Sequence, residues 1–346
     1  MTPIPVTILT GFLGAGKTTL LNRILREPHG NKIAVIENEF GQENIDNEIL
    51  VQESNEQIVE MSNGCICCTV RGDLIAALGT LAQKRNAGEL QFDRVVIETT
   101  GLANPGPVAQ TFFMDDTVAR YYLLDAIVTV VDARHAMQQL DEHEEAQRQV
   151  GFADKLLLSK TDLVGTVEMQ ALTERIKRIN PRAPLATSDF GRAPINEVLD
   201  LRGFNLNDKL DIDPDFLKAE EHDHEHAHHD CDEHCVHDHH DHHHAHHSDD
   251  IAAFVFRSEQ PFDSGRLDEF LGSLVQVYGP SMLRYKGVLW MDGVDRKVIF
   301  QGVHQMMGTD IGAKWADTET RCSKIVFIGK NLPKDTFIRG LEQCVV

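Results

Sequence analysis

The chain is short of basic residues and of long apolar runs, and each shortage narrows the classes of protein that fit it. It has 33 Lys and Arg against 54 Asp and Glu among 346 residues, so its formal net charge is −21 at pH 7. An acidic surface repels nucleic-acid phosphates and anionic lipid headgroups, so we expect neither nucleic acid nor membrane as a partner. No apolar run approaches the roughly 20 residues that a transmembrane helix requires.

The chain also lacks the cysteine pattern of a disulfide framework. Its seven cysteines are an odd number, and three of them, Cys65, Cys67 and Cys68, stand within four positions. The N-terminal residues carry neither a basic segment nor a cleavage site of the secretory type. We therefore expect a cytoplasmic protein, because free thiols persist in a reducing compartment.

The acidic charge is concentrated in one low-complexity tract. Residues 219–250 hold 11 Asp and Glu and no Lys or Arg, so they carry −11 of the net charge. The tract has almost no side chain able to enter a core, and this composition predicts a disordered linker. We accordingly expect three parts: an N-terminal domain at 1–203, a linker with the tract at 204–250, and a C-terminal domain at 251–346.

Before the tract, short strand-like runs alternate with helix-like segments. Five apolar runs fit strands buried on both faces of a parallel sheet, at residues 5–10, 32–38, 94–100, 126–133 and 155–162. Four candidate helices lie between or after them, at Lys17–Arg26, Thr69–Lys84, His135–Gly151 and Thr166–Ile179. This alternation predicts an α/β fold with three layers and a mainly parallel sheet.

After the tract the order of elements changes. Strand-like runs at residues 252–258, 286–293, 297–304 and 323–329 are accompanied by only two candidate helices, Ser264–Val277 and Lys334–Gln343. That order predicts a smaller α+β domain, with helices on one face of an antiparallel sheet.

A phosphate-binding loop follows the first predicted strand. The segment "GFLGAGKT" begins at Gly11 and fits G-x-x-x-x-G-K-[ST], between a strand and a helix as the motif requires. Lys17 can reach the β- and γ-phosphates, and the Thr18 hydroxyl can bind Mg²⁺. The nucleotide-binding residues predicted here are Gly11, Gly14, Ala15, Gly16, Lys17, Thr18 and Thr19. The first domain is therefore predicted to be a P-loop nucleotide-binding domain.

Two later segments complete the predicted nucleotide site. Glu98 ends the strand "RVVIE", where its carboxylate can organise the magnesium shell, and Gly101 leaves room for the backbone to approach a γ-phosphate. The alternative for Glu98 is an ordinary solvated carboxylate at a strand end, and the phosphate loop favours the functional interpretation. We predict Lys17 and Glu98 as the catalytic pair.

The segment "SKTD" ends a further strand and is similar to the N-K-x-D element that binds guanine. Asp162 can accept hydrogen bonds from guanine N1–H and its exocyclic amine, a pattern that adenine does not satisfy. Lys160 is placed to lie along the ring, and Ser159 stands where the element usually has Asn. These residues predict GTP rather than ATP as the nucleotide.

Taken together, these segments resemble the CobW-type metallochaperone GTPases. The resemblance rests on "TGFLGAGKTTLLN", "IENEFG", "NGCICC", "IETTGLANPGP", "KTD" and "LRYKGVLW", in this order over nearly the whole chain except the histidine tract. The layout is also similar to UreG- and HypB-type GTPases. The resemblance implies GTP hydrolysis, transition-metal binding at the C-x-C-C segment, and a CobW C-terminal domain.

Three interpretations compete for Cys65, Cys67 and Cys68. They could pack as small apolar residues, but adjacent side chains of an extended segment point to opposite sides. They could form a disulfide, but the ring between near neighbours would be strained. As thiolate ligands for Zn²⁺, Cu(I) or Co²⁺ they need only a tight turn, which Gly64 permits. We predict metal ligation.

Three thiolates leave a fourth tetrahedral position. Glu37 and Glu39 are the candidates, because "ENEFG" leaves the second strand toward the nucleotide face. Both acidic residues and the cysteines lie between the phosphate loop and Glu98, where nucleotide-sensing switch segments are commonly found. Thiolates on a switch would change geometry on hydrolysis, so GTP and GDP would favour different metal affinities.

The tract supplies a second set of metal ligands. Fourteen of the 18 histidines lie in it, and neutral imidazole binds Zn²⁺, Ni²⁺ and Co²⁺. The alternative is a merely solvating linker. A flexible arm of this length would present collected metal to the cysteine segment. The predicted ligands are His222, His224, His226, His228, His229, His234, His237, His239, His240, His242, His243, His244, His246 and His247.

Together these features predict a slow GTPase that delivers a divalent transition metal to a client metalloprotein, and zinc is the metal that we expect. Slow turnover is expected because neither an arginine finger nor a water-positioning glutamine is evident, so a client or a nucleotide- or metal-dependent homo-oligomer would supply activation. Open alternatives are a metal-buffering protein with a regulatory nucleotide site, a small-molecule phosphotransferase, and cobalt handling for cobalamin synthesis. Ligand type alone does not separate zinc from cobalt or nickel.

Overall fold

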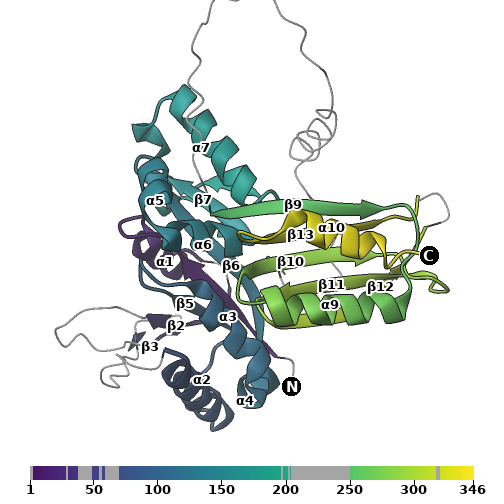
Figure 1. Cartoon of the computed structure of the whole chain (residues 1–346). Helices are drawn as coiled ribbons and strands as arrows, with labels where there is room; N and C mark the ends of the chain where they lie inside the picture. The colour runs from purple at the N-terminus through teal and green to yellow at the C-terminus, as the bar shows by residue number, and fades with distance from the viewer. Residues whose placement is uncertain are drawn as a thin grey trace, which may run out of the picture.

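The computed structural model describes residues 3–28, 30–37, 49–53, 57–58, 70–195, 198–201, 203, 250–316 and 320–346. These residues form an N-terminal domain around one sheet and a C-terminal domain around another (Figure 1). Both predicted sheet types are confirmed, the first mainly parallel and the second antiparallel.

The N-terminal sheet has the strand order β4-β3-β2-β5-β1-β6-β7-β8. The six parallel strands are β1 (Ile4–Thr10), β2 (Ile33–Glu37), β5 (Arg94–Glu98), β6 (Tyr122–Asp132), β7 (Lys155–Ser159) and β8 (Leu185–Thr187). The antiparallel strands β3 (Ile49–Glu53) and β4 (Gln57–Ile58) extend one edge. The carboxyl ends of β2, β5 and β1 therefore meet at one edge of the sheet.

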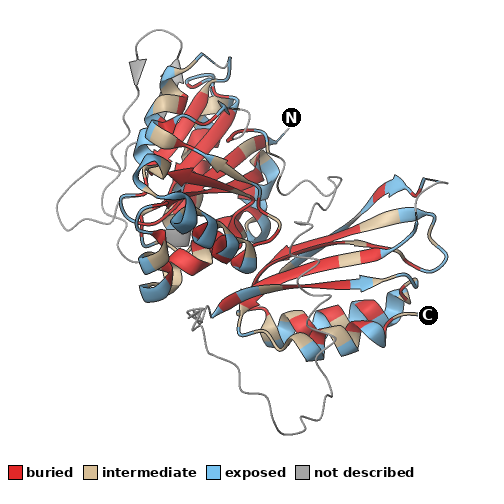
Figure 2. Ribbon diagram, turned by 90° about the horizontal axis from the view of Figure 1, so that it is seen from above, coloured by how far each residue is buried: buried red, intermediate tan, exposed pale blue. Residues whose placement is uncertain are grey.

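Apolar side chains bury both faces of this sheet, which is why its strands are near-continuous apolar runs (Figure 2). Along β1, Ile4, Val6 and Ile8 enter one core, whereas Leu9 enters the core on the opposite face. The second core contains the apolar residues of α1, such as Leu20 and Ile24.

The described part of this domain contains seven α-helices. They are α1 (Lys17–Arg26), α2 (Val70–Asn86), α3 (Pro105–Met114), α4 (Asp116–Tyr121), α5 (Ala136–Glu142), α6 (Glu144–Phe152) and α7 (Thr166–Ile179), with short 3-10 turns at η1 (Thr161–Leu163) and η2 (Asp189–Gly191). Sequence analysis did not predict α3, whose start is marked by the Asn104 side chain accepting from the Gly106 N–H.

The predicted single helix at His135–Gly151 is wrong, because two helices occupy this region. His143 has extended backbone angles (φ −132°, ψ 114°) and separates α5 from α6. Its ring lies against that of Phe12 in the phosphate loop, with centroids 4.7 Å apart. Tertiary packing of this histidine accompanies the break, and a helical pattern in the sequence does not reveal it.

The C-terminal sheet has the order β12-β11-β10-β13-β9 and is antiparallel throughout. Its strands are β9 (Ile251–Ser258), β10 (Met282–Leu289), β11 (Arg296–Val303), β12 (Met306–Lys314) and β13 (Ser323–Lys330). Helices α9 (Ser264–Tyr278) and α10 (Lys334–Glu342) cover one face (Figure 1). The edge strand β12 is the element that sequence analysis missed.

The other face of this sheet packs on the N-terminal domain. Ile251, Leu283 and Ile328 belong to the same core as Phe152 of α6, so one apolar core runs through both domains. Inside this interface the Asp154 carboxylate accepts hydrogen bonds from Arg182 (2.8 Å) and Arg284 (3.0 Å). Within the described ranges, no helix has the length and apolarity needed to cross a membrane.

Candidate nucleotide and metal site

A cavity of about 320 Å³ lies at the carboxyl ends of β1, β2 and β5. Its lining comes from three separate stretches of the chain, two that sequence analysis assigned to the nucleotide site and one, at Glu37, that it assigned to the metal site. The lining residues are Leu13, Gly14, Lys17, Thr18, Glu37, Glu98, Thr99, Thr100, Gly101 and Leu102. Ligands of open α/β sheets commonly bind at this edge.

The phosphate loop has the backbone conformation that its glycines predict. Gly14 (φ 71°) and Gly16 (φ 99°) are in the left-handed region, where a side chain would be strained. A Cβ on Gly11 would lie 2.2 Å from the Val130 carbonyl oxygen, so the strand end has no room for one. Ala15 is fully buried and its N–H donates to Phe12 O (3.2 Å), whereas Thr19 is exposed on the first turn of α1.

Lys17 is a buried ammonium directed into this loop. It is 8% exposed, and its Nζ donates to the carbonyl oxygens of Gly11 (2.9 Å) and Phe12 (3.3 Å). Burial lowers the pKa of Lys17, and the nearby Glu98 carboxylate partly opposes that effect. Two carbonyl groups are weaker partners for an ammonium than phosphate oxygens, so this geometry is suited to exchange for an anionic ligand.

Thr18 and Glu98 face each other across the cavity wall. The Thr18 hydroxyl donates to Glu98 Oε1 at 2.7 Å, although 80 residues separate them in the chain. A hydroxyl and a carboxylate at this separation form a hard oxygen donor set that fits Mg²⁺. The residues therefore fit the magnesium ion that the phosphate loop predicts.

Glu37 lies at the same edge of the sheet. It ends β2, pairs in register with Glu98 of β5, and lines the cavity. One of the two predicted acidic metal ligands is thus at the nucleotide cavity. Glu39 lies outside the described residues.

The turn after β5 is pressed against the phosphate loop. A Cβ on Gly101 would lie 2.6 Å from a Leu13 side-chain atom and 2.7 Å from its backbone, so only glycine fits this contact. The Gln149 side-chain amide of α6 donates to the carbonyl oxygens of Gly101 (3.1 Å) and Ala103 (3.0 Å). Sequence analysis did not single out Gln149, because a glutamine within a helical pattern carries no signal of its own.

The predicted base-binding residues lie at the carboxyl end of β7. Lys160 is in the left-handed region (φ 56°), and its Nζ donates to Asp132 Oδ2 at 2.6 Å. Asp132 also contacts His135 Nδ1 at 2.9 Å. Burial opposes ionisation of Asp132, but the hydrogen bonds from Lys160 and His135 outweigh it, and its pKa is lowered. Asp132 is a second residue that the sequence analysis missed.

The serine in place of the usual asparagine has a structural partner. Ser159 Oγ donates to Ala15 O of the phosphate loop at 2.7 Å and so ties β7 to that loop. Asp162 lies in η1, which is joined to the next loop by the hydrogen bond from Thr161 N to Asp189 Oδ1 (2.7 Å). The buried Ser188 hydroxyl has no hydrogen-bond partner among the described residues.

The structure does not test the predicted thiolate and imidazole ligands. Cys65, Cys67, Cys68 and the 14 histidines from His222 to His247 lie outside the described residues. Where the structure does describe the chain, no group of three or more His, Cys, Asp and Glu side chains could hold a metal ion. Metal ligation by these residues stays a prediction.

Two family models match the chain. The CobW/HypB/UreG nucleotide-binding domain matches residues 5–187, and the cobalamin synthesis protein cobW C-terminal domain matches residues 251–345. The chain belongs to the CobW family. The resemblance inferred from the short segments is therefore confirmed over both domains of this family member.

Characterised relatives and a solved structure agree with this assignment. The chain is 40% identical over 336 residues to the zinc chaperone YjiA of Escherichia coli, covering 97% of this chain and 96% of YjiA. It is 32% identical over 372 residues to the zinc chaperone CobW of Pseudomonas aeruginosa, covering 98% and 91%. The crystal structure of Zn(II)-bound YjiA GTPase superimposes with a TM-score of 0.79 at 36% identity, covering 100% of both chains.

Proposed function

We propose that this protein is a cytoplasmic GTP-hydrolysing metallochaperone that binds a divalent transition metal, zinc, and delivers it to a client metalloprotein. The observation that carries the hydrolytic half is the convergence of Lys17, Thr18 and Glu98 on one cavity. The relatives that are named zinc chaperones support the choice of zinc.

In the proposed reaction GTP and water give GDP and phosphate. Lys17 exchanges its two carbonyl partners for β- and γ-phosphate oxygens. Thr18 and Glu98 would hold Mg²⁺, which when bound would neutralise charge on the phosphates. Among the described residues that line the cavity, Lys17 is the only cation, so we expect slow turnover until a client or a second copy supplies another.

Base selection belongs to the other end of the site. Asp162 accepts from guanine N1–H and the exocyclic amine, while Lys160, held by Asp132, lies along the ring. Adenine has no N1–H to donate to this carboxylate, so it would lose hydrogen bonds that guanine makes. We expect hydrolysis of GTP to exceed that of ATP by roughly 100-fold or more on this ground.

Metal binding is proposed for Cys65, Cys67 and Cys68, with Glu37 or Glu39 as the fourth ligand. The position of Glu37 at the nucleotide cavity supports a link between the two sites, because one ligand would then respond to nucleotide and metal together. The tract at 219–250, within the proposed linker 204–250, would collect metal for this site. Domains at 1–203 and 251–346 would hold the nucleotide and contribute to client choice.

Titration of GTP into the full chain, with and without one equivalent of Zn²⁺, tests this proposal. Coupling is reciprocal, so Zn²⁺ should change GTP affinity, and GTP should change Zn²⁺ affinity, by the same factor of roughly 5 to 150. Replacing Cys67 with Ser should abolish that factor.

A variant lacking residues 220–247 is the matched control. It should bind fewer Zn²⁺ ions per chain and keep both GTP hydrolysis and the coupling factor, because the nucleotide cavity is built from other segments. Identical GTP affinities with and without Zn²⁺ in the full chain would contradict the coupling. Absence of GTP turnover in the presence of Mg²⁺, Zn²⁺ and client would contradict the hydrolytic function.

A further inference from the structure

Gln149 is a buried polar residue whose side-chain amide nitrogen donates hydrogen bonds to the turn at the edge of the nucleotide cavity. Its side chain is 1% exposed, on α6, and its amide nitrogen donates to the carbonyl oxygens of Gly101 and Ala103. Both oxygens belong to the turn that follows Glu98. A buried amide with two such acceptors fixes the orientation of the peptide planes that it binds.

The orientation of these peptide planes sets the direction of the backbone N–H groups of the turn. The described peptide bonds are trans, so a carbonyl directed at Gln149 directs the N–H of the following residue the opposite way. The Gly101 carbonyl therefore places the Leu102 N–H on the side away from buried Gln149. Leu102 lines the cavity and is 53% exposed, so this turn borders the space beside the phosphate loop.

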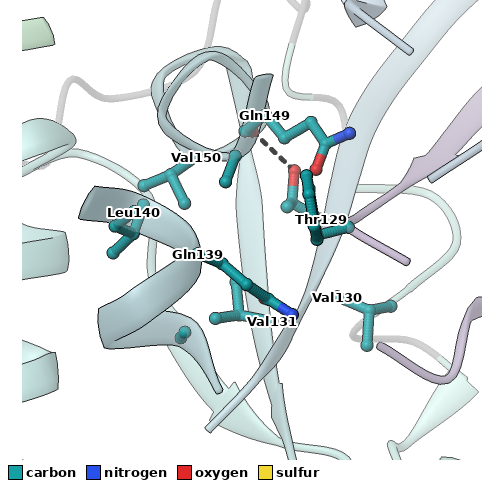
Figure 3. A pocket seen from close by; sticks show the side chains of 10 residues that line it. Thr129, Val130, Val131, Gln139, Leu140, Gln149 and Val150 are labelled. Carbon is teal, nitrogen blue, oxygen red and sulfur yellow. Dashed lines mark hydrogen bonds between the residues drawn. The ribbon is translucent and has the colours of Figure 1, made fainter. Parts of the chain in front are cut away.

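The helix that carries Gln149 is itself fixed in place. The Thr129 hydroxyl of β6 donates to the Gln149 carbonyl oxygen at 2.8 Å (Figure 3). Two residues earlier, Gln147 donates to Leu140 O (2.8 Å) and accepts from Ile251 N (3.3 Å) at the start of the C-terminal sheet. A Cβ on Gly151 would lie 2.9 Å from Leu283, so α6 touches β10 closely. The amide of Gln149 is therefore held by a rigid helix and by the C-terminal domain behind it.

We propose that Gln149 is a positioning residue that presents the turn at Gly101–Ala103 to the γ-phosphate and thereby sets the preference for GTP over GDP. The inference rests on the proposed GTPase function. A diphosphate ends before the turn, because Lys17 and the phosphate loop hold the β-phosphate, so only a triphosphate gains from a correctly oriented turn. Donors fixed before the reaction also cost no reorganisation as charge develops.

The test replaces Gln149 with Leu, which keeps the approximate volume and removes the donor. GDP affinity should stay within about twofold of wild type. Affinity for a non-hydrolysable GTP analogue should fall roughly tenfold, as expected for one well-formed hydrogen bond. Because a preorganised donor contributes more in the transition state, kcat should fall roughly 100-fold. Affinities are measured by titration calorimetry and kcat by phosphate release, all on the full chain.

Gln147→Leu is the matched control. Gln147 is also a buried glutamine of α6, but its hydrogen bonds reach Leu140 and Ile251 and leave the nucleotide turn untouched. We expect this variant to lower the midpoint of thermal unfolding at least as much as Gln149→Leu and to keep the wild-type ratio of GTP to GDP affinity. Gln149→Met, with an unbranched side chain, repeats the measurement should the leucine variant not fold.

Equal losses of GDP and GTP-analogue affinity in both Gln149 variants would overturn the inference, since they would mean a purely structural role. Wild-type affinities for both the GTP analogue and GDP in these variants would overturn it as well. Failure of the proposed function is distinguishable, because wild-type protein would then bind the GTP analogue without releasing phosphate. In that case a lower analogue affinity in Gln149→Leu would still support the positioning role.

Discussion

The nucleotide cavity and the domain interface both bury charged side chains, but they satisfy them differently. In the cavity, the Lys17 ammonium is held by two backbone carbonyls, and its pKa is lowered because burial outweighs the attraction of Glu98. At the interface, burial opposes ionisation of Asp154, but Arg284 and Arg182 outweigh it, and the pKa of this carboxyl is lowered. The Lys17 ammonium gains a charged partner for its free donors only when an anionic ligand binds. The Asp154 carboxylate already has two arginine partners within the fold.

This difference separates function from stability. A charge with weak partners costs free energy of folding and becomes useful only when a ligand arrives. A charge with strong buried partners adds little beyond an apolar equivalent, yet removing one member leaves the others buried and unpaired. Changes at the two places should therefore have opposite consequences for activity and for the free energy of unfolding.

The largest effect on stability is expected from Asp154→Asn. The substitution removes the carboxylate that neutralises two buried guanidinium groups, so it should lower the free energy of unfolding by about 3–5 kcal/mol. Urea-induced unfolding monitored by circular dichroism measures it. Asp295→Asn is the control, because the exposed pair with Lys314 (2.9 Å) should leave stability unchanged. Equal free energies of unfolding for Asp154→Asn and wild type would contradict the proposed difference between the interface and the cavity.

Lys17→Ala should lower activity without lowering stability, in contrast to Asp154→Asn. Hydrolysis of GTP should fall by roughly 100- to 1,000-fold, the usual cost of losing one preorganised electrostatic contact. The free energy of unfolding should stay the same or rise, because the variant no longer buries an ammonium with a lowered pKa. The same substitution at Lys32, which is partly buried and does not line the cavity, is the control for activity. A strong loss of stability in Lys17→Ala would show that this lysine is mainly structural.

The smallest effect, a dependence of stability on pH, sharpens the comparison at His304. Burial of this ring beside Phe152 lowers its pKa, an effect that Arg148 reinforces and the carbonyl of Gly279 opposes. In the unfolded state the histidine pKa is about 6.5, so the unfolded state binds a proton more readily than the folded state does. The free energy of unfolding should therefore fall as the pH drops below that value.

His304→Asn should flatten this dependence between pH 7 and pH 5, and asparagine tolerates the left-handed backbone angle at this position (φ 51°). Thermal unfolding across the pH series provides the measurement. A profile for His304→Asn that matches wild type would assign the pH dependence to other groups.

Local patterns in the sequence predicted the elements whose signals lie close together along the chain. The helix Lys17–Arg26 follows directly from its phosphate loop, and the structure has it with the predicted ends. Thr166–Ile179 also begins and ends where its apolar periodicity places it. The strand β12 has glycines at positions 308 and 312 and a weak alternation, which explains why it was missed.

The polar pairings that sequence analysis missed, at the site and at the domain interface, join residues that lie far apart in the chain. Gln149 meets Gly101 across 48 positions, Lys160 meets Asp132 across 28, and Arg284 meets Asp154 across 130. None of these pairings changes a local propensity or a motif, because each depends on which strands become neighbours. The topology has to be known before such polar partners can be predicted.

The apolar core shared by Phe152, Ile251 and Leu283 has a practical consequence for anyone who shortens this protein. Cutting the chain ahead of β9 would strip a hydrophobic flank from α6 and leave Gln147 without its acceptor role at Ile251. Such a fragment would be prone to self-association. Its α6 would also fix the turn at Gly101–Ala103 less rigidly. We therefore expect activity measured on the isolated N-terminal domain to be lower than that of the full chain.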